Sequence, residues 1–190
     1  MNNLVIFDLD DTLLCTDSEF HFTKYILNQG MLDKDFYIKK IKAFDKDYRS
    51  GNLNFKDYMR FLLNPLIGKT KNELDFLVTS FINSSKDILI DDLTLKLLEK
   101  HKEDRLLIAS GALDFVVKGF ADFFEVKEYL GTKTEFIENK VTGEITGEPN
   151  FDKGKLINVS EWCMKNKLNL ENATFYTDSI HDLHPVKKCK

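Results

Sequence analysis

The sequence predicts an α/β protein whose parallel β-sheet is flanked by helices. Three short apolar runs have the pattern of buried strands in such a sheet, and each is followed by residues that can do chemistry. The runs cover 4–7, 105–109 and 173–177, and they are followed by Asp8, Ser110 and Asp178. Because ligands of open α/β sheets bind beyond the carboxyl ends of the strands, these three ends predict one shared site.

The first two predicted strands are separated by far more chain than one crossover requires. About 100 residues lie between Asp8 and Ser110, whereas a strand–helix–strand unit needs about 30 residues. Four segments in this interval carry apolar residues at helical spacing, which predicts a small bundle of amphipathic helices. We therefore expect residues 15–87 to form an inserted helical cap, and residues 1–14 and 88–190 to form the catalytic core.

Start signals mark the predicted helices of this insertion. Asp17 and Asn54 are candidate N-caps, and Thr70 with Glu73 forms a capping-box pattern. The second helix, over 35–50, carries an apolar stripe that we expect to form the core of the bundle. The stripe consists of Tyr37, Ile41, Phe44 and Tyr48.

The chain after Ser110 continues to alternate between helices and strands. We expect a helix, a strand, a hairpin and another helix, over about 112–123, 127–132, 135–145 and from about Lys155 onward. The strand at 173–177 should lie at a sheet edge, because 184–190 is mostly polar and contains Pro185. Such an edge predicts either a homodimer or low stability. We also expect the residues after Asp182 to be poorly ordered.

Composition limits the classes of protein and partner. The 190 residues, 43% hydrophobic and 31% charged, fit one globular domain or one core with an insertion. The net charge of −4 argues against a nucleic-acid partner. No apolar run reaches the ~18 residues of a membrane span and no signal-peptide pattern is seen, so we expect no membrane partner. Three widely spaced cysteines predict free thiols and a cytoplasmic location.

Acidic residues at two of the strand ends predict a cation site. Asp8 and Asp10 are two residues apart, so in an extended backbone their side chains point the same way. Two carboxylates this close repel each other unless a cation or a proton separates them, and Mg²⁺ prefers oxygen ligands. Asp178 and Asp182 offer two more carboxylates after the third strand. Taken alone, each cluster fits an acidic turn or a helix cap as well.

Two further features suit an anionic phosphate. The Ser110 hydroxyl and the backbone N–H groups that follow from Gly111 onward lie at a predicted helix N-terminus, which attracts anions. Lys155 follows Gly154 at another predicted helix start, and Lys153 competes with it for the same role.

In this order along the chain, the residues resemble the haloacid dehalogenase-like phosphatase superfamily. The string DLDDTL from Asp8 resembles its first motif, Ser110 the second, Lys155 the third, and DSIHD from Asp178 the fourth. A helical insertion between the first two motifs is similar to the phosphoserine-phosphatase-like branch. The resemblance covers nearly the whole chain. It implies a Rossmann-like core, with a parallel sheet flanked by helices and an inserted small helical-bundle cap.

The resemblance also implies a chemical role for the acidic residues of the first motif. Asp8 would attack the phosphorus atom, and Asp10 would act as general acid and then as general base. Mg²⁺ would be held by the Asp8 carboxylate, the Asp10 backbone carbonyl and Asp178.

The remaining motif residues would bind the substrate or support those that do. Ser110, Gly111 and Lys155 would bind the phosphoryl oxygens. Asp182 would be a further metal ligand or would orient Lys155. Asp17, where the chain enters the cap, would face the substrate.

We therefore expect a Mg²⁺-dependent phosphomonoesterase that acts on a small phosphorylated metabolite through an aspartyl-phosphate, with phosphoserine as the best single substrate. One alternative is an inactive binding protein that keeps the fold. The other is a phospho-receiver signalling domain, which would need neither Asp10 nor an inserted cap of this size.

Overall fold

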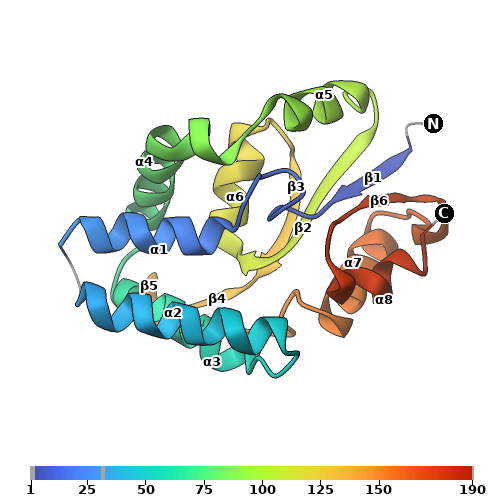
Figure 1. The fold of residues 1–190 in the computed structure, drawn as a ribbon. Coiled ribbons are helices and arrows are strands. Elements are labelled where there is room, and N and C mark those ends of the chain that lie inside the picture. Colours follow the sequence, from blue (N-terminus) through green and yellow to red (C-terminus); the bar gives the residue numbers. More distant parts are fainter. Residues whose placement is uncertain (1–2, 31–32, 190) are drawn as a thin grey trace.

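The protein is built around a four-stranded parallel sheet (Figure 1). The computed structural model describes residues 3–30 and 33–189. The strands stand in the order β3-β2-β1-β6, and every neighbouring pair is parallel. Their bounds are β1 Leu4–Phe7, β2 Arg105–Leu113, β3 Glu128–Thr132 and β6 Thr174–Tyr176. The predicted α/β fold with a parallel sheet core is confirmed.

Both faces of the sheet are covered, which explains why the interior strand β1 is an uninterrupted apolar run. Val5 and Phe7 of β1 join a core cluster with helix α6 (Asp114–Phe123) on one face, whereas Ile6 points to the other. There it packs in a cluster with helix α7 (Lys153–Lys165). A strand buried on both sides needs apolar residues at every position rather than at alternate ones.

Every regular element that the structure describes between β1 and β2 is helical. These elements are α1 Ser18–Asn28, α2 Lys34–Arg49, α3 Phe55–Leu63, the 3₁₀ helix η1 Asn64–Leu66, α4 Lys71–Leu89 and α5 Asp92–Lys100. The predicted caps are present: Asp17 accepts from the Phe20 N–H at 2.6 Å, and Asn54 caps α3. Thr70 and Glu73 form the predicted capping box. Local side-chain chemistry therefore places these helix starts.

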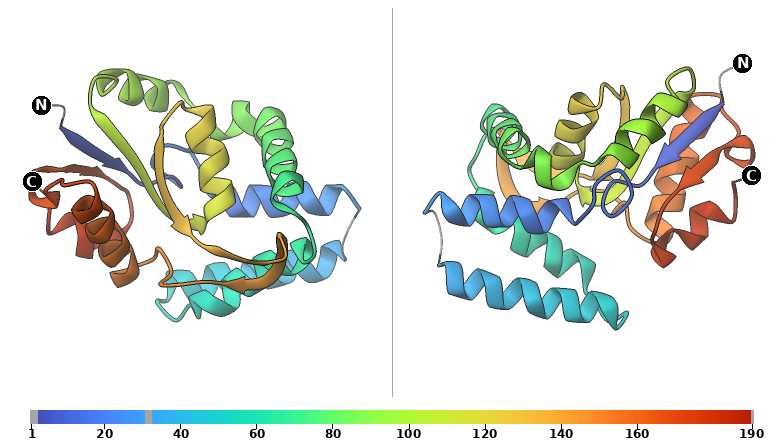
Figure 2. Two further views of the ribbon diagram at one scale, coloured as in Figure 1. Left: turned by 180° about the vertical axis from the view of Figure 1, so that it is seen from behind. Right: turned by 45° about the horizontal axis from the view of Figure 1, so that its top comes forward.

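The insertion is attached to the rest of the molecule in two different ways. Helices α1 and α4 pack into the main core, where Phe22 contacts the rings of Phe81 and Phe115. The pair α2–α3 lies at the opposite end of the molecule from α5 (Figure 2). It is joined to the hairpin β4 (Thr134–Ile137) and β5 (Lys140–Ile145), with the Arg60 guanidinium 2.8 Å from Glu144.

Two predicted helix starts differ from the structure, and one helix was not predicted. Strand β2 runs on to Leu113, so α6 begins at Asp114 rather than near 112. Helix α7 begins at Lys153, two residues before the predicted start. The predicted cap exit near 87 falls inside the continuous helix α4, and α5 was not predicted. The division into cap and core at residues 15–87 stays a prediction.

The expectation of disorder after Asp182 is wrong for the residues that the structure describes. The segment forms the short helix α8 (Leu183–Val186), which follows η2 (Leu170–Asn172), β6 and η3 (Ile180–Asp182). Pro185 is buried, and Cys189 packs against the core cluster that contains α7. Strand β6 does lie at the sheet edge, as predicted; the homodimer through that edge stays a prediction. None of the helices described is both long and apolar enough to span a membrane.

The close contact between α4 and α6 gives a stability test. A Cβ added to Gly119 would lie 2.2 Å from Cγ1 of the buried Val78 and 3.2 Å from Cδ1 of Ile82. Gly to Ala inside a helix is normally stabilising by about 1 kcal/mol, but overpacking costs about 1–3 kcal/mol. We therefore expect Gly119→Ala to lower the Tm in a thermal melt. In a Val78→Ala background the same change should be neutral or stabilising, and a Tm raised by Gly119→Ala alone would contradict this packing.

Candidate active site

The carboxyl ends of three neighbouring strands meet at one place, as the sequence predicts. Asp8 directly follows β1, and its N–H extends the sheet by donating to the Tyr176 carbonyl of β6 at 2.9 Å. Ser110 lies in the adjacent strand β2, and its Oγ is 3.5 Å from Oδ2 of Asp10. Asp178 lies two residues beyond β6. Parallel pairing alone therefore assembles residues that are more than 160 positions apart in the chain.

A buried ammonium holds the centre of the site. Lys155 is only 3% exposed, and its Nζ lies 3.2 Å from Asp8 Oδ1 and 2.7 Å from the Asp182 carboxylate. Burial raises the pKa of Asp8 to about 7, while the Lys155 charge opposes that rise and Asp182 adds to it. The pKa of Lys155 itself is raised: burial lowers it, but the charges of Asp8 and Asp182 outweigh burial.

The geometry distinguishes Lys155 from its competitor. Lys153 is exposed in the first turn of α7, whereas Lys155 points inward. Gly154 allows the start of α7 to lie close to the preceding turn, because a Cβ at this position would lie 2.0 Å from the Pro149 carbonyl oxygen. Only glycine lets the start of α7 pack this tightly against the preceding turn.

Asp10 faces the start of α1 and the second strand end. Its Oδ1 accepts from the Ser18 N–H at 2.6 Å, at the first turn of α1. The backbone reverses direction between Leu9 and Leu14, with Asp11 in the left-handed region at φ 52°. Burial raises the pKa of Asp10 well above the usual aspartate range, and the negative charge of Asp17 adds to the rise. A raised pKa favours the protonated form of the carboxyl group, which is the form that a general acid needs.

Asp178 is held against the first loop by a threonine. The Asp178 N–H donates to Thr12 Oγ1 at 3.2 Å, and that hydroxyl lies 3.5 Å from Asp178 Oδ1. Thr177 supports the same corner by donating to Asp182 at 2.9 Å. Burial, and then the charge of Asp11, raises the pKa of Asp178. Sequence reasoning missed both threonines as site residues, although each lies beside a motif aspartate.

The segment after Ser110 is built differently from the prediction. Because β2 continues through it, the helix does not start here, and two of its N–H groups are already engaged. The Ala112 N–H donates to Ser110 Oγ at 3.1 Å, and the Leu113 N–H donates to buried Glu19 at 2.8 Å. The expectation of free N–H groups at a helix N-terminus is therefore wrong for these two. What Ser110 and Gly111 present to the site are a hydroxyl and a glycine backbone.

Two buried polar side chains that the sequence did not single out fix this segment. Asn150 donates to the Ser110 carbonyl at 2.8 Å and accepts from Asn158. Glu19, in the first turn of α1, also hydrogen-bonds Tyr58 of α3. Burial and the charges of Asp17 and Asp10 raise the pKa of Glu19 well above its usual value. Polar residues in apolar segments carry little sequence signal, because their partners lie far along the chain.

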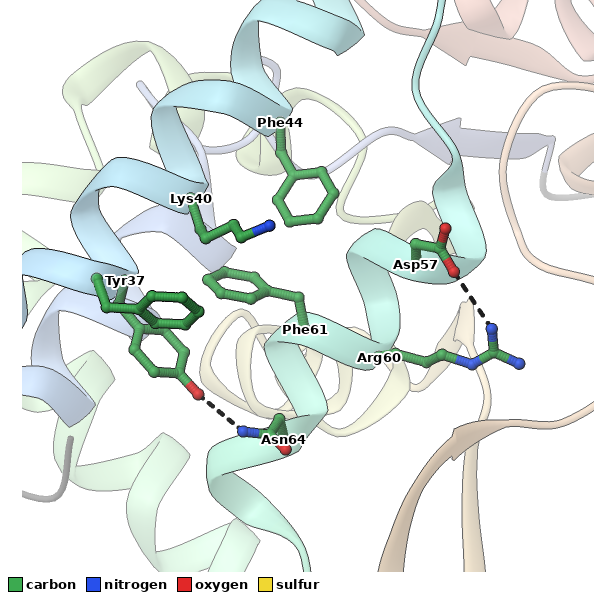
Figure 3. A pocket seen from close by; sticks show the side chains of 8 residues that line it. Tyr37, Lys40, Phe44, Asp57, Arg60, Phe61 and Asn64 are labelled. Carbon is green, nitrogen blue, oxygen red and sulfur yellow. Dashed lines mark hydrogen bonds and ion pairs between the residues drawn. The ribbon is translucent and has the colours of Figure 1, made fainter. Parts of the chain in front are cut away.

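A separate hollow of about 560 Å³ lies between α2 and α3 (Figure 3). It is lined by aromatic rings and by charged side chains, and the Tyr37 hydroxyl accepts from Asn64 at 3.0 Å on one side of it. None of the predicted site residues lines it. The hollow is therefore a feature of the helical pair and not part of the carboxylate site.

A family model described as haloacid dehalogenase-like hydrolase matches residues 5–185. The chain belongs to this family. The sequence resemblance and the prediction of a hydrolase of this family are thereby confirmed. The family model spans all of the motif positions from Asp8 to Asp182.

Individual relatives agree with the family. The chain is 29% identical over 189 residues to a histidinol-phosphatase from Neisseria meningitidis serogroup C (strain 8013), covering 96% of this chain and 85% of that protein. A protein of unknown function from Bordetella pertussis Tohama I has the same fold, with a TM-score of 0.84, 24% identity, and coverage of 97% and 86%. A substrate-bound phosphoserine phosphatase matches with a TM-score of 0.67 and 18% identity, covering 100% of this chain and 83% of that one.

The donor set of this hydrolase fits a hard divalent cation. Burial is the largest cause that raises the pKa values of Asp8, Asp10 and Asp178, so their ionised forms are poorly solvated, and of these three only Asp8 has an ammonium group beside it among the residues described. Oxygen ligands short of positive charge suit Mg²⁺. Within residues 3–30 and 33–189, no group of three or more His, Cys, Asp or Glu side chains forms a metal cluster. The predicted set differs in kind, since it joins two carboxylates to one backbone carbonyl.

The raised pKa values predict that the metal-free protein loses stability as pH rises. A carboxyl group with a raised folded pKa keeps its proton after the unfolded chain has lost it. The stability that such a group contributes therefore falls as the pH rises. For Asp8 the fall extends from about pH 4, the pKa in the unfolded chain, to about pH 7.

Glu19 allows this effect to be tested by substitution. In Glu19→Gln the buried negative charge is absent, but an acceptor for the Leu113 N–H remains.

We expect Glu19→Gln to raise the Tm relative to wild type, and the gain should be larger at about pH 8 than at about pH 5. The measurement is a set of thermal melts in EDTA. Glu161→Gln, at an exposed glutamate of α7, serves as the control and should show no such growth. A gain from Glu19→Gln that does not change with pH would contradict a buried charge at Glu19.

Proposed function

We propose that this hydrolase is a Mg²⁺-dependent phosphomonoesterase that acts on a small phosphorylated metabolite through an aspartyl-phosphate on Asp8. One observation carries the proposal. Asp8 is buried at the end of the central strand, 3.2 Å from a lysine ammonium, in a site where Asp10 lies beside Ser110. A nucleophile, a general acid, and a hydroxyl and an ammonium group that can bind phosphate are then all present in one place.

The first half-reaction would transfer the phosphoryl group to the protein. An oxygen of the Asp8 carboxylate forms a bond to phosphorus while the bond from phosphorus to the ester oxygen breaks. Asp10 donates its proton to that oxygen, so the alcohol leaves neutral. The Lys155 charge favours the ionised form of Asp8 that this attack requires.

The second half-reaction would return the site to its starting state. Asp10, now ionised, takes a proton from a water molecule while the water oxygen attacks phosphorus. The bond between phosphorus and the Asp8 oxygen breaks, and inorganic phosphate is released. One residue thus supplies and recovers the same proton.

Phosphate binding would fall to Ser110, Gly111 and Lys155. Their hydroxyl, backbone and ammonium groups can stabilise charge that moves onto the phosphoryl oxygens. Asp182 holds Lys155 at 2.7 Å and in turn accepts from Thr177, so we assign Asp182 a positioning role. The Asp8 and Asp178 carboxylates and the Asp10 carbonyl would hold Mg²⁺, which would supply positive charge that offsets the repulsion between nucleophile and substrate.

Residues 15–87 would form a cap over this site, and Asp17 would face the substrate from the start of α1. The named activities of the relatives give two leading substrates, L-histidinol phosphate and phosphoserine. The free thiols among the described residues fit a reducing cytoplasm. The inactive-protein alternative is disfavoured because every motif residue is present in the chain.

Asp8→Asn should abolish turnover, because it removes the proposed nucleophile. Phosphate release from p-nitrophenyl phosphate with Mg²⁺ measures this. Asp11→Asn is the matched control, since Asp11 is an exposed aspartate of the same loop, and it should keep most of the activity. Substantial phosphate release by a folded Asp8→Asn protein would contradict the covalent mechanism.

Asp10→Asn should slow hydrolysis of alkyl phosphates by about 10²–10⁴-fold, the usual contribution of a positioned acid or base. The loss should be smaller for p-nitrophenyl phosphate in the first step, because nitrophenolate leaves without a proton. Burst amplitudes in pre-steady-state kinetics separate the two steps. An equal first-step loss for both ester types would argue against Asp10 as the acid.

Activity should require Mg²⁺, and EDTA should remove it reversibly. Asp178→Ala should weaken Mg²⁺ binding strongly, because a hard cation then loses a charged oxygen ligand. Isothermal titration with Mg²⁺ measures the affinity directly, and Asp35→Ala on α2 serves as the control. Unchanged affinity in Asp178→Ala would show that this ligand is wrongly assigned.

A further inference from the structure

Four rings meet where the helical pair α2–α3 touches the loops of the catalytic side. Tyr48 and Phe55 come from the end of α2 and the start of α3, whereas Phe151 comes from the loop before α7 and His181 from η3. Phe55 stacks on Phe151 at 4.5 Å, and His181 lies 4.8 Å from Phe151 and 4.9 Å from Tyr48. We call these four residues the ring cluster.

The ring cluster borders two parts of the site. Beside the proposed phosphate-binding residue Gly111, the position of an added Cβ would be 3.6 Å from the Phe151 ring and 3.8 Å from the Phe55 ring. Beside the proposed metal ligand Asp178, the Tyr48 hydroxyl lies 3.5 Å from Ser179 Oγ. Burial raises the pKa of Tyr48, and the charges of Asp178, Asp8 and Lys155 all act on its hydroxyl. The cluster therefore adjoins the place where the ester would bind.

The sequence predicted that Tyr48 packs inside the helical bundle, and for this residue the prediction is wrong. Its stripe neighbour Tyr37 is 4% exposed and packs on Phe61 of α3. Tyr48 instead is 39% exposed and turns toward Phe151 and His181. A ring whose only function was to fill a core would be buried like Tyr37, whereas the partly open ring of Tyr48 lies beside the proposed reaction centre and is accessible to a ligand there.

The arrangement of the rings indicates what kind of group fits. The imidazole of His181 already lies between Tyr48 and Phe151, at centroid distances within the 4.5–7 Å that aromatic pairs prefer. The part of the Tyr48 ring that His181 leaves exposed can accept another flat ring in a stacked or edge-on position. A puckered aliphatic ring of similar size gains apolar contact but not the additional electrostatic attraction between aromatic rings.

We propose that the ring cluster binds the leaving alcohol of the phosphate ester and selects alcohols that carry a flat ring, such as imidazole or benzene. This inference rests on the proposed phosphomonoesterase function. It makes Tyr48, Phe55 and Phe151 specificity-determining residues, and it favours a ring-bearing ester over phosphoserine.

The test compares two esters that differ mainly in the shape of the ring, phenylethyl phosphate and cyclohexylethyl phosphate. Wild-type kcat/KM should be about threefold to tenfold higher for the flat ring, the size of an aromatic pair contribution. Tyr48→Leu and Phe151→Leu should bring this ratio close to one, whereas Tyr48→Phe should keep it. Phe36→Leu, at an exposed ring on the same helix as Tyr48, should leave the ratio unchanged.

The outcomes separate this inference from the function on which it rests. Hydrolysis of both esters at equal kcat/KM, or a ratio that survives in folded Tyr48→Leu, would overturn the ring preference and leave the phosphatase proposal standing. If none of the two esters and p-nitrophenyl phosphate is hydrolysed in the presence of Mg²⁺, both the ring preference and the phosphatase proposal are overturned. Because Tyr48 is partly exposed on a helix surface, Tyr48→Leu keeps the test valid if Phe151→Leu does not fold.

Discussion

The buried ammonium of Lys155, between the carboxylates of Asp8 and Asp182, is the interaction on which the rest of the site depends. It joins the end of β1, the first turn of α7 and the loop after β6. A buried charge without its partners costs several kcal/mol, so displacement of any one of these segments would leave an unpaired charge in the interior. Gly154, next to Lys155, permits the close packing of the start of α7 against the Pro149 carbonyl.

On the side of the site next to α1, negative charge is in excess. Asp10, Asp17 and Glu19 lie near one another there. The charge of Asp17 raises the pKa of Asp10, and the charges of Asp17 and Asp10 raise the pKa of Glu19. Such repulsion destabilises the free protein, and binding of a cation or a proton relieves it. A site that would be held together by its ligands is typical of enzymes, which give up some stability for function.

Much of this fold could be predicted because its signals are local. A strand buried on both faces is an apolar run, and a helix cap needs only one side chain and the N–H groups that follow it. Lys155 and the aspartates became candidates because their order along the chain matches the motifs of the family. The structure assigned what depends on distant contacts: Glu19 and Asn150 bind backbone groups about 94 and 40 positions away. Periodicity placed Tyr48 on a helix face, but it could not tell what that face meets, and the burial of Pro185 likewise depends on packing that no local pattern reveals.

The central claim is that the phosphoryl group passes through Asp8, and chemical quenching tests it most directly. A radiolabelled phosphate ester is mixed with the protein and Mg²⁺, the reaction is stopped with acid within the first turnover, and the labelled peptide is mapped. We expect a transient label on Asp8 that forms before phosphate is released. This label should survive acid and should be lost in base or hydroxylamine. Release of phosphate with no covalent label at any time, or a label on another residue, would contradict it.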